Sequence, residues 1–258
     1  MSELTGNGAV GIPAVDIAAE PHIETQAPPL ELVGVHAGYG GIEVLHGIDL
    51  AVPAGEVVAL LGANGAGKST AVKVCAGLLR PTAGSVRVAG HDVTGAASND
   101  LARIGVCTIP EGRGVFANLT VRENLWMATH VTGGDRGDLE AAAYARFPRL
   151  GDRRTQLAGT LSGGEQQMLA MARALVTDPA VLLLDELSMG LAPIVVQQLY
   201  EIVAQVAAEG ISILVVEQFA QAVLGIADRA AIMVTGEITR VGTPAEMQSE
   251  LSSAYLGG

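Results

Sequence analysis

The chain has 258 residues, of which 49% are hydrophobic, and it carries a formal net charge of −12. This length and apolar content suffice for one large or two small domains with a buried core. The negative charge argues against a surface that neutralises nucleic-acid phosphates, so we expect no nucleic-acid partner. The longest stretch without a charged residue, residues 187–200, is shorter than the roughly 20 apolar residues that a membrane-spanning helix needs.

Residues 1–29 are rich in alanine, glycine, proline and acid and show no sustained period, so we expect a mobile extension. They contain no lysine or arginine, whereas a secretory signal starts with a positively charged region. We therefore expect a cytosolic protein. Cys75 and Cys107 lie in apolar surroundings at an unrelated spacing, which favours two reduced core thiols over a disulfide or a metal pair.

From Leu30 onward, short apolar runs broken by glycines predict strands at about 32–35 and 44–50. Three later runs are apolar at successive positions, which is typical of parallel strands covered on both faces by helices: 57–61, 181–184 and 211–216. Between and after these runs, apolar residues at helical spacing predict helices over 168–176 and 199–206. The alternation predicts an α/β fold with a mostly parallel sheet.

Residues 115–165 predict a helical insertion. Thr120 and Glu123 have the spacing of a capping box at the start of a helix, which we expect to end at Gly133-Gly134. A second helical segment is predicted from about 138 to 147. Near the C-terminal end, apolar runs at 231–234 and 238–241 predict a hairpin around Gly236, followed by a capping box at 243–246. We expect these elements to form a modest closing subdomain.

Residues 62–70 read Gly-Ala-Asn-Gly-Ala-Gly-Lys-Ser-Thr, which matches the phosphate-loop pattern between a predicted strand and a helical run. The glycines let backbone N–H groups face phosphates, and the helix presents its positive end to them. Lys68 would contact the β- and γ-phosphates and Ser69 would bind Mg²⁺. A chance match in an ordinary turn is the alternative. The predicted nucleotide-binding positions here are Gly62, Asn64, Gly65, Gly67, Lys68, Ser69 and Thr70.

Two adjacent carboxylates, Asp185 and Glu186, close the predicted strand at 181–184. Ligands gather at the carboxyl edge of an open α/β sheet, where both side chains would emerge. Asp185 would hold Mg²⁺, and Glu186 would polarise the water that attacks the γ-phosphate. The alternative is that the two acids only cap the next helix.

The hexapeptide Leu-Ser-Gly-Gly-Glu-Gln at 161–166 opens a predicted helix between the phosphate loop and the two carboxylates. Its glycines free the backbone, its serine supplies a hydroxyl, and the helix dipole favours an anion. Since the chain already has a phosphate loop, this second anion site makes most sense facing a nucleotide held by another subunit. The alternative is a plain serine-capped helix. The predicted contacts are Ser162, Gly163, Gly164, Glu165 and Gln166.

Together these motifs resemble those of the ATP-binding subunits of ABC transporters, and the resemblance covers about residues 30–258. Several segments resemble more narrowly one of the two sister ATPases of bacterial branched-chain amino-acid importers: 110–113, 159–169, 190–193, 216–218 and 254–258. The resemblance implies a P-loop ABC cassette with a mostly parallel central sheet, an N-terminal antiparallel β subdomain and a helical subdomain at about 115–165.

The resemblance also suggests roles for three further residues. Tyr39 falls where the family stacks an aromatic ring on adenine; an ordinary turn aromatic is the alternative. Glu111 stands at the position of the usual Q-loop glutamine, near Mg²⁺ and water, but an ionised carboxylate cannot donate a hydrogen bond. Gln218 replaces the usual switch histidine, and its amide can donate to the γ-phosphate but cannot shuttle a proton. We count Glu186, Gln218 and Glu111 as candidate catalytic residues.

The resemblance implies an ATPase that couples MgATP binding and hydrolysis to the import of hydrophobic amino acids. Its implied partners are a sister ATPase or second copy, two transmembrane permeases and an external binding protein, which would place it on the cytoplasmic face of the inner membrane. Import of urea or short amides is one alternative. A soluble ABC-type ATPase not coupled to transport, or a nucleotide switch that barely turns over, is another.

Overall fold

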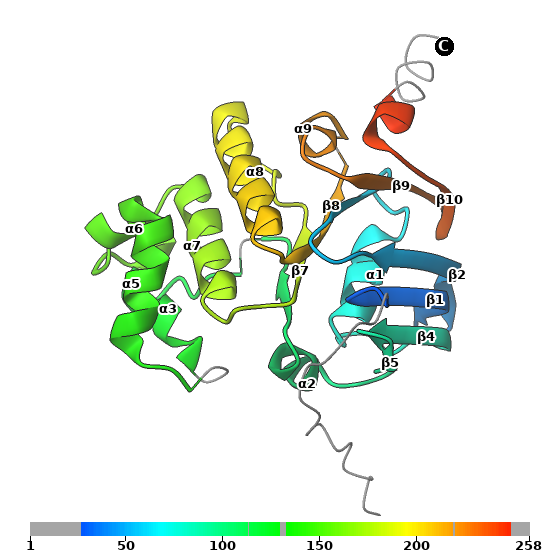
Figure 1. Ribbon diagram of the computed structural model, residues 1–258, viewed down its shortest axis with the longest axis horizontal. Helices are drawn as coiled ribbons and strands as arrows, with labels where there is room; N and C mark the ends of the chain where they lie inside the picture. The colour runs from blue at the N-terminus through cyan, green and yellow to red at the C-terminus, as the bar shows by residue number, and fades with distance from the viewer. Residues whose placement is uncertain (1–26, 113, 130–132, 219, 249–258) are drawn as a thin grey trace, which may run out of the picture.

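The computed structural model describes residues 27–112, 114–129, 133–218 and 220–248 (Figure 1). The predicted mobile extension, apart from its last three residues, lies outside this part of the chain, as do Arg113 and the terminal segment 254–258. The described chain forms two sheets with helices packed around them.

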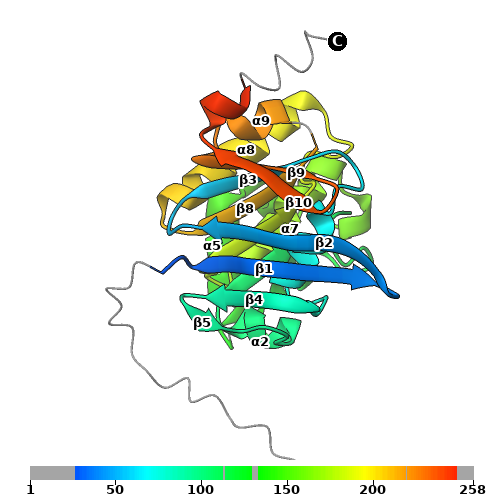
Figure 2. The same cartoon turned by 90° about the vertical axis from the view of Figure 1, so that its right-hand side faces the viewer.

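The first sheet is antiparallel and contains four strands. In chain order these are β1 (Leu30–Tyr39), β2 (Ile42–Val52), β4 (Ala83–Val88) and β5 (His91–Asp92), arranged as β2-β1-β4-β5. Figure 2 shows β2, β1 and β4 side by side. The turn between β1 and β2 uses Gly40 and Gly41, both with positive φ, a conformation that glycine adopts without a steric penalty. The predicted β-rich start is confirmed.

The second sheet is mostly parallel. Its strands are β3 (Val57–Leu61), β6 (Val106–Ile109), β7 (Val181–Asp185), β8 (Ser212–Glu217), β9 (Arg229–Val234) and β10 (Glu237–Gly242). The order is β10-β9-β3-β8-β7-β6, with only β10 antiparallel to its neighbour. The predicted hairpin β9–β10 forms around Gly236. The expectation of a separate closing subdomain is wrong, because β9 pairs in parallel with β3 and extends this sheet.

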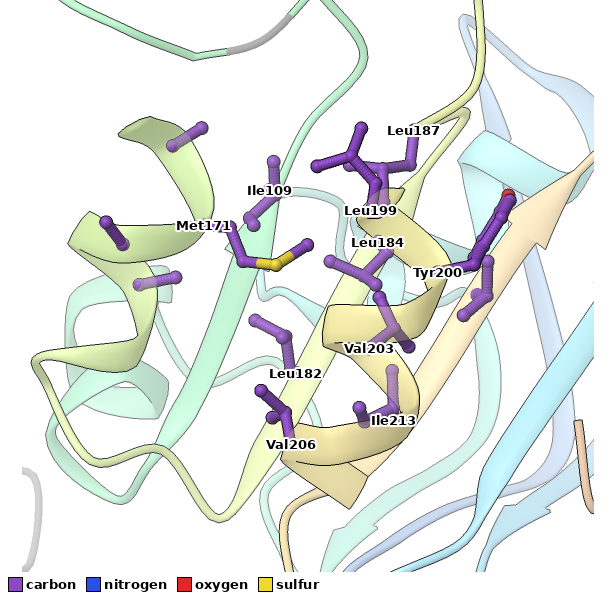
Figure 3. Packing of buried hydrophobic residues seen from close by; sticks show 14 of the residues in the cluster. Ile109, Met171, Leu182, Leu184, Leu187, Leu199, Tyr200, Val203, Val206 and Ile213 are labelled. Atoms are coloured by element: carbon purple, nitrogen blue, oxygen red, sulfur yellow. The ribbon is translucent and has the colours of Figure 1, made fainter. Parts of the chain in front are cut away.

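Successive residues of the central strands face two different cores. On β3, Val57, Ala59 and Leu61 lie in one core, and Val58 and Leu60 lie in the other. The first core is covered by α7 (Gly163–Leu175), α8 (Pro193–Ala208) and α9 (Ala220–Leu224), as Figure 3 shows for α7 and α8. The second core lies against α1 (Lys68–Cys75) and the antiparallel sheet. The prediction of helices on both faces is therefore confirmed, and on one face the antiparallel sheet shares the covering with α1.

The remaining helices are α2 (Ser98–Arg103), α3 (Val121–Trp126), α5 (Arg136–Arg146), α6 (Pro148–Asp152) and the short 3₁₀ helix η1 (Ala158–Thr160). Figure 1 shows α3, α5 and α6 next to α7, at the opposite end of the molecule from the antiparallel sheet. Thr120 and Glu123 form the predicted capping box. The helix ends at Trp126 rather than at Gly133-Gly134, because Ala128 N–H bonds to Leu125 in a tighter turn and the Thr129 hydroxyl donates to the Trp126 carbonyl.

Two other predictions concern the C-terminal part and the cysteines. Thr243 and Glu246 form the second capping box, and residues 244–248 are helical.

Cys75 is buried, Cys107 is half-buried, and both are free thiols. Within the described ranges, no helix has the length and apolar character needed to cross a membrane.

Candidate functional site

Four segments with predicted functional residues meet at one edge of the parallel sheet. The phosphate loop follows β3, Gln218 follows β8, Asp185 and Glu186 stand at the end of β7, and Glu111 follows β6. These strands are adjacent in the order β3-β8-β7-β6, and they run in the same direction. Their carboxyl ends therefore share the edge at which open α/β sheets bind ligands.

The phosphate loop holds a buried lysine next to a carboxylate. Lys68 is 4% exposed; its Nζ donates to the Ala63 carbonyl at 3.1 Å and lies 3.7 Å from Glu186 Oε1. Helix α1 begins after Gly67, whose φ of 109° only glycine adopts readily, and no side chain caps its first N–H groups. Unpaired N–H groups at a helix start attract a phosphate. The loop can thus surround an anion with a lysine, glycine backbone and a helix N-terminus.

Two glycines of this loop also serve its packing. A β-carbon at Gly62 would overlap the Met233 carbonyl oxygen, and one at Gly67 would lie 3.0 Å from Leu45 Cδ2. The turn between β9 and β10 holds the loop directly, since Gly236 N–H donates to the Ala66 carbonyl at 2.7 Å. Sequence reasoning related these glycines only to phosphate and missed the supporting turn, because the contacts join positions far apart in the chain.

Ser69 and Asp185 place a hydroxyl and a carboxylate next to each other. The Ser69 hydroxyl donates to Asp185 Oδ1 at 3.2 Å, and both lie beside Lys68 and Glu186. A hydroxyl and a carboxylate fit Mg²⁺, which prefers oxygen ligands and commonly takes one or two from the protein and the rest from phosphates and water. Burial is the main reason that the pKa of Asp185 rises to about 6; Glu186 and Glu111 add to the rise, and Ser69 and Lys68 oppose it. A bound cation would favour the ionised form.

Glu186 has an unusual backbone conformation. Its φ is 48°, in the left-handed region that residues other than glycine rarely adopt. Its N–H donates to the Val216 carbonyl on β8 at 2.9 Å, and its side chain is 12% exposed. The strained backbone directs this carboxylate toward the phosphate loop, as its 3.7 Å distance from Lys68 shows. Strain of this kind is concentrated at functional sites.

Of the three residues singled out by the family resemblance, Glu111 and Gln218 follow strands that end at this edge, and Tyr39 lies beside α1. Glu111 and Gln218 are exposed, and the charge of Glu111 acts on Asp185. Tyr39 is 45% exposed at the end of β1, and Lys73 of α1 lies over its ring at 5.6 Å from the centroid. The ring therefore stands beside the helix that follows the phosphate loop. The roles of all three remain predictions.

The signature segment forms a closed hydrogen-bond unit at the start of α7. Ser162 caps the helix by accepting from Glu165 N–H, and the Glu165 carboxylate accepts from both the N–H and the hydroxyl of Ser162. Arg153 Nε lies 3.0 Å from that carboxylate, and Gln166 donates to the Ala158 carbonyl at 2.9 Å. Burial would raise the pKa of Glu165, but the bonds from Ser162 and the arginine charges lower it on balance.

Two details of the signature segment were missed in the sequence. The Ser162–Glu165 spacing is itself a capping-box pattern, so the signal was present but was not used. A β-carbon at Gly164 would overlap Val195 of α8, so this glycine is needed for helix packing. Figure 1 separates α7 from α1, with β7 and α8 between them in this view. The chain therefore brings Lys68, Ser69, Asp185 and Glu186 together but does not bring the signature segment to its own phosphate loop.

Comparison with known proteins defines the class to which this fold and site belong. Residues 45–188 match the sequence model of the ABC transporter family, and the chain belongs to this family. A crystal structure of the ADP conformation of an ATP-binding cassette of an ABC transporter is similar, with a TM-score of 0.78 and 25% identity, covering 89% of this chain and 98% of that one. The predicted fold, family and ATP ligand are confirmed.

Two curated relatives come from Pseudomonas aeruginosa. The high-affinity branched-chain amino acid transport ATP-binding protein BraG is 45% identical over 223 residues, which cover 85% of this chain and 96% of BraG. The protein of the same description named BraF is 30% identical over 250 residues, which cover 89% of this chain and 98% of BraF. A probable branched-chain amino acid transport ATP-binding protein, LivF of Archaeoglobus fulgidus, is 36% identical over 84% of this chain and 93% of LivF.

Proposed function

We propose that this chain is the ATP-hydrolysing subunit of an importer for branched-chain amino acids. The observation that carries the ATPase assignment is the meeting of Lys68, Ser69, Asp185 and Glu186 at one edge of the parallel sheet. The similarity to BraG along nearly its whole length supports the cargo. In this proposal residues 30–258 form one nucleotide-binding domain with a helical subdomain at about 115–165, and residues 1–29 precede it as an extension.

Each residue of the site has a defined role in hydrolysis. The phosphate-loop backbone from Gly62 to Thr70 surrounds the phosphates, and Lys68 neutralises charge on the β- and γ-phosphates. Ser69 and Asp185 would hold Mg²⁺, with Glu111 close to its shell. When bound, the ion neutralises charge that develops on the phosphate oxygens. Tyr39 stacks on the adenine.

Glu186 acts as the general base. Its carboxylate accepts a proton from water as the water oxygen forms a bond to the γ-phosphorus, while the bond from that phosphorus to the β-γ bridging oxygen breaks. The products are ADP and inorganic phosphate. Gln218 donates its amide N–H to the γ-phosphate. Because an amide cannot exchange a proton as an imidazole does, Gln218 positions the phosphate without relaying the proton.

The signature segment acts on the nucleotide of a second cassette, either a sister ATPase or another copy of this chain. Ser162, Gly163 and Gly164 present a hydroxyl, backbone N–H groups and a helix N-terminus to the γ-phosphate. Glu165 and Gln166 hold this helix start in shape through Ser162 and Ala158. ATP then joins two cassettes, and hydrolysis lets them part. Two transmembrane permeases convert this motion into transport, an external binding protein delivers the cargo, and the cassettes sit on the cytoplasmic face of the inner membrane.

A transport experiment tests the proposal. The tagged chain is purified from solubilised membranes with its associated polypeptides, and the assembly is placed in proteoliposomes with the binding protein. We expect ATP-dependent uptake of labelled leucine, isoleucine and valine, and loss of uptake when Glu186→Gln replaces the unsubstituted chain. Uptake of urea or acetamide in place of these amino acids would overturn the cargo. Purification without any permease would overturn the transport role.

A further inference from the structure

A buried carboxylate at the end of β8 has no role in the chemistry proposed above. Glu217 is 1% exposed. Its Oε1 accepts from the Ser188 N–H at 2.9 Å and from the Tyr200 hydroxyl at 2.6 Å, and its Oε2 accepts from the Ser188 hydroxyl at 2.8 Å. The three donors are neutral groups, and removing a charged group from water is costly unless such bonds compensate it. The burial of this carboxylate therefore needs a structural reason, and the groups that donate to it indicate that reason.

Glu217 holds the turn that follows the proposed general base. Ser188 is two residues after Glu186, and the segment Glu186–Ser188 is bonded to two elements, β8 and α7. Glu186 N–H donates to the Val216 carbonyl of β8, Glu217 accepts from Ser188, and the Gln167 amide of α7 donates to the Leu187 carbonyl at 3.3 Å. Figure 3 shows Tyr200 on α8 beside β8, from where its hydroxyl reaches the same carboxylate.

This turn needs firm support because Glu186 is strained. A residue other than glycine in the left-handed region is energetically unfavourable and persists only where its surroundings hold it. The backbone bond to Val216 fixes the start of the turn, and the Glu217 carboxylate fixes its end at Ser188. Released at Ser188, the turn could relax and move the Glu186 carboxylate away from Lys68.

We propose that Glu217 is a positioning residue for ATP hydrolysis, which clamps the turn at Leu187–Ser188 onto β8 and so holds Glu186 facing the phosphate loop. This inference rests on the proposed function of Glu186. Burial first, and then the charge of Glu217, raise the pKa of Tyr200, so its phenol stays protonated and keeps donating to the clamp.

Steady-state kinetics of the full chain test the clamp. Glu217→Met keeps the length of the side chain but has no oxygen to accept from the Ser188 N–H, the Ser188 hydroxyl or the Tyr200 hydroxyl. We expect kcat to fall about 10-fold or more and the KM for ATP to stay within about twofold, because the phosphate loop is unchanged while the base is misplaced. Tyr200→Phe leaves both bonds to Ser188 and should lower kcat less.

A matched control lies at the other edge of the sheet. Asp228 is a carboxylate that also accepts from a backbone N–H, that of Val57 at the start of β3, at 2.8 Å. Asp228→Leu removes this acceptor and should leave kcat within about twofold of the unsubstituted value, because the bond is remote from Glu186. A fall in kcat as large as that of Glu217→Met would show that any lost carboxylate contact slows hydrolysis, and would overturn the clamp.

A double substitution separates positioning from a general structural effect. If Glu217 acts through Glu186, then Glu217→Met should not lower the residual rate of Glu186→Gln any further. Independent, multiplicative losses would overturn the clamp, as would an unchanged kcat for Glu217→Met. Should Glu217→Met not fold, Ser188→Ala removes one bond of the clamp and should show the same pattern at smaller size. An unsubstituted chain that hydrolyses no MgATP would contradict the proposed function itself, which distinguishes the two failures.

Discussion

Replacing Asp185 by asparagine should stabilise the nucleotide-free protein while removing its activity. Asp185 is 6% exposed, and burial, followed by the charges of Glu186 and Glu111, raises its pKa from the ordinary 3.8 to about 6. The folded protein thus binds this proton more tightly than the unfolded chain does. The contribution of Asp185 to the free energy of unfolding is therefore greatest at low pH, where the carboxyl is protonated. It falls as the pH rises from about 4 to about 6 and is lost above that range.

The size of the effect follows from the same pKa. One pH unit of difference between the folded and unfolded pKa corresponds to about 1.4 kcal/mol, so full ionisation of Asp185 costs at most about 3 kcal/mol. Solvent near the open side of the site screens part of this cost, so we expect a gain of about 1 to 2 kcal/mol at pH 8. Asparagine has a similar size, and its amide oxygen can still accept from the Ser69 hydroxyl.

Urea unfolding of the nucleotide-free chain at pH 8 and pH 5 measures this gain. Asp185→Asn should be the more stable protein at pH 8, with an advantage that shrinks by about half at pH 5. Asp152→Asn, at the exposed end of α6, should show neither effect. Equal stability of Asp185→Asn and the unsubstituted chain at pH 8, or a gain that does not change with pH, would refute the reasoning from burial.

Three further substitutions test separate parts of the account. Glu186→Gln should lower turnover by roughly 10² or more with ATP affinity retained in equilibrium binding, and unchanged turnover would remove Glu186 from the role of base. Ser162→Arg should abolish ATP-driven dimerisation on size-exclusion chromatography without weakening nucleotide binding by the isolated chain; Ser162→Ala, which adds no bulk, should still dimerise. Glu165→Gln should lower stability at pH 7 by about 1 kcal/mol. Because the pKa of Glu165 is lowered in the folded protein, this difference should be full above the ordinary value of 4.5 and should shrink as the pH falls below it, and a difference that is as large at pH 3.5 as at pH 7 would contradict the role of the carboxylate in the cap.

Local patterns in the sequence predicted the central strands and the phosphate loop. Strands β3, β7 and β8 contain uninterrupted apolar runs, at 57–61, 181–184 and 213–216, because both faces are buried, and this signal lies within a few consecutive residues. The phosphate loop could be recognised for the same reason, since all its residues lie between Gly62 and Thr70. The meeting of Lys68 with Glu186 could be expected once both motifs were placed at the carboxyl ends of parallel strands.

Features that depend on distant pairing could not be predicted in this way. That β9 would join β3, and that the antiparallel sheet would cover one face, depends on which elements meet in three dimensions. Likewise, Gly164 must be small because of Val195, a residue on another helix. The clamp at Glu217 was also invisible, because its three donors come from a turn and a helix that the chain only brings together on folding.

The central claim is that the signature helix of one cassette completes the nucleotide site of another. A structure of the MgATP-bound assembly, trapped with Glu186→Gln, measures this most directly. We predict that the Ser162 hydroxyl and the N–H groups of Gly163 and Gly164 lie within hydrogen-bond distance of a γ-phosphate whose phosphate loop belongs to the opposite cassette. A structure in which these groups face solvent, or contact no nucleotide, would contradict the account.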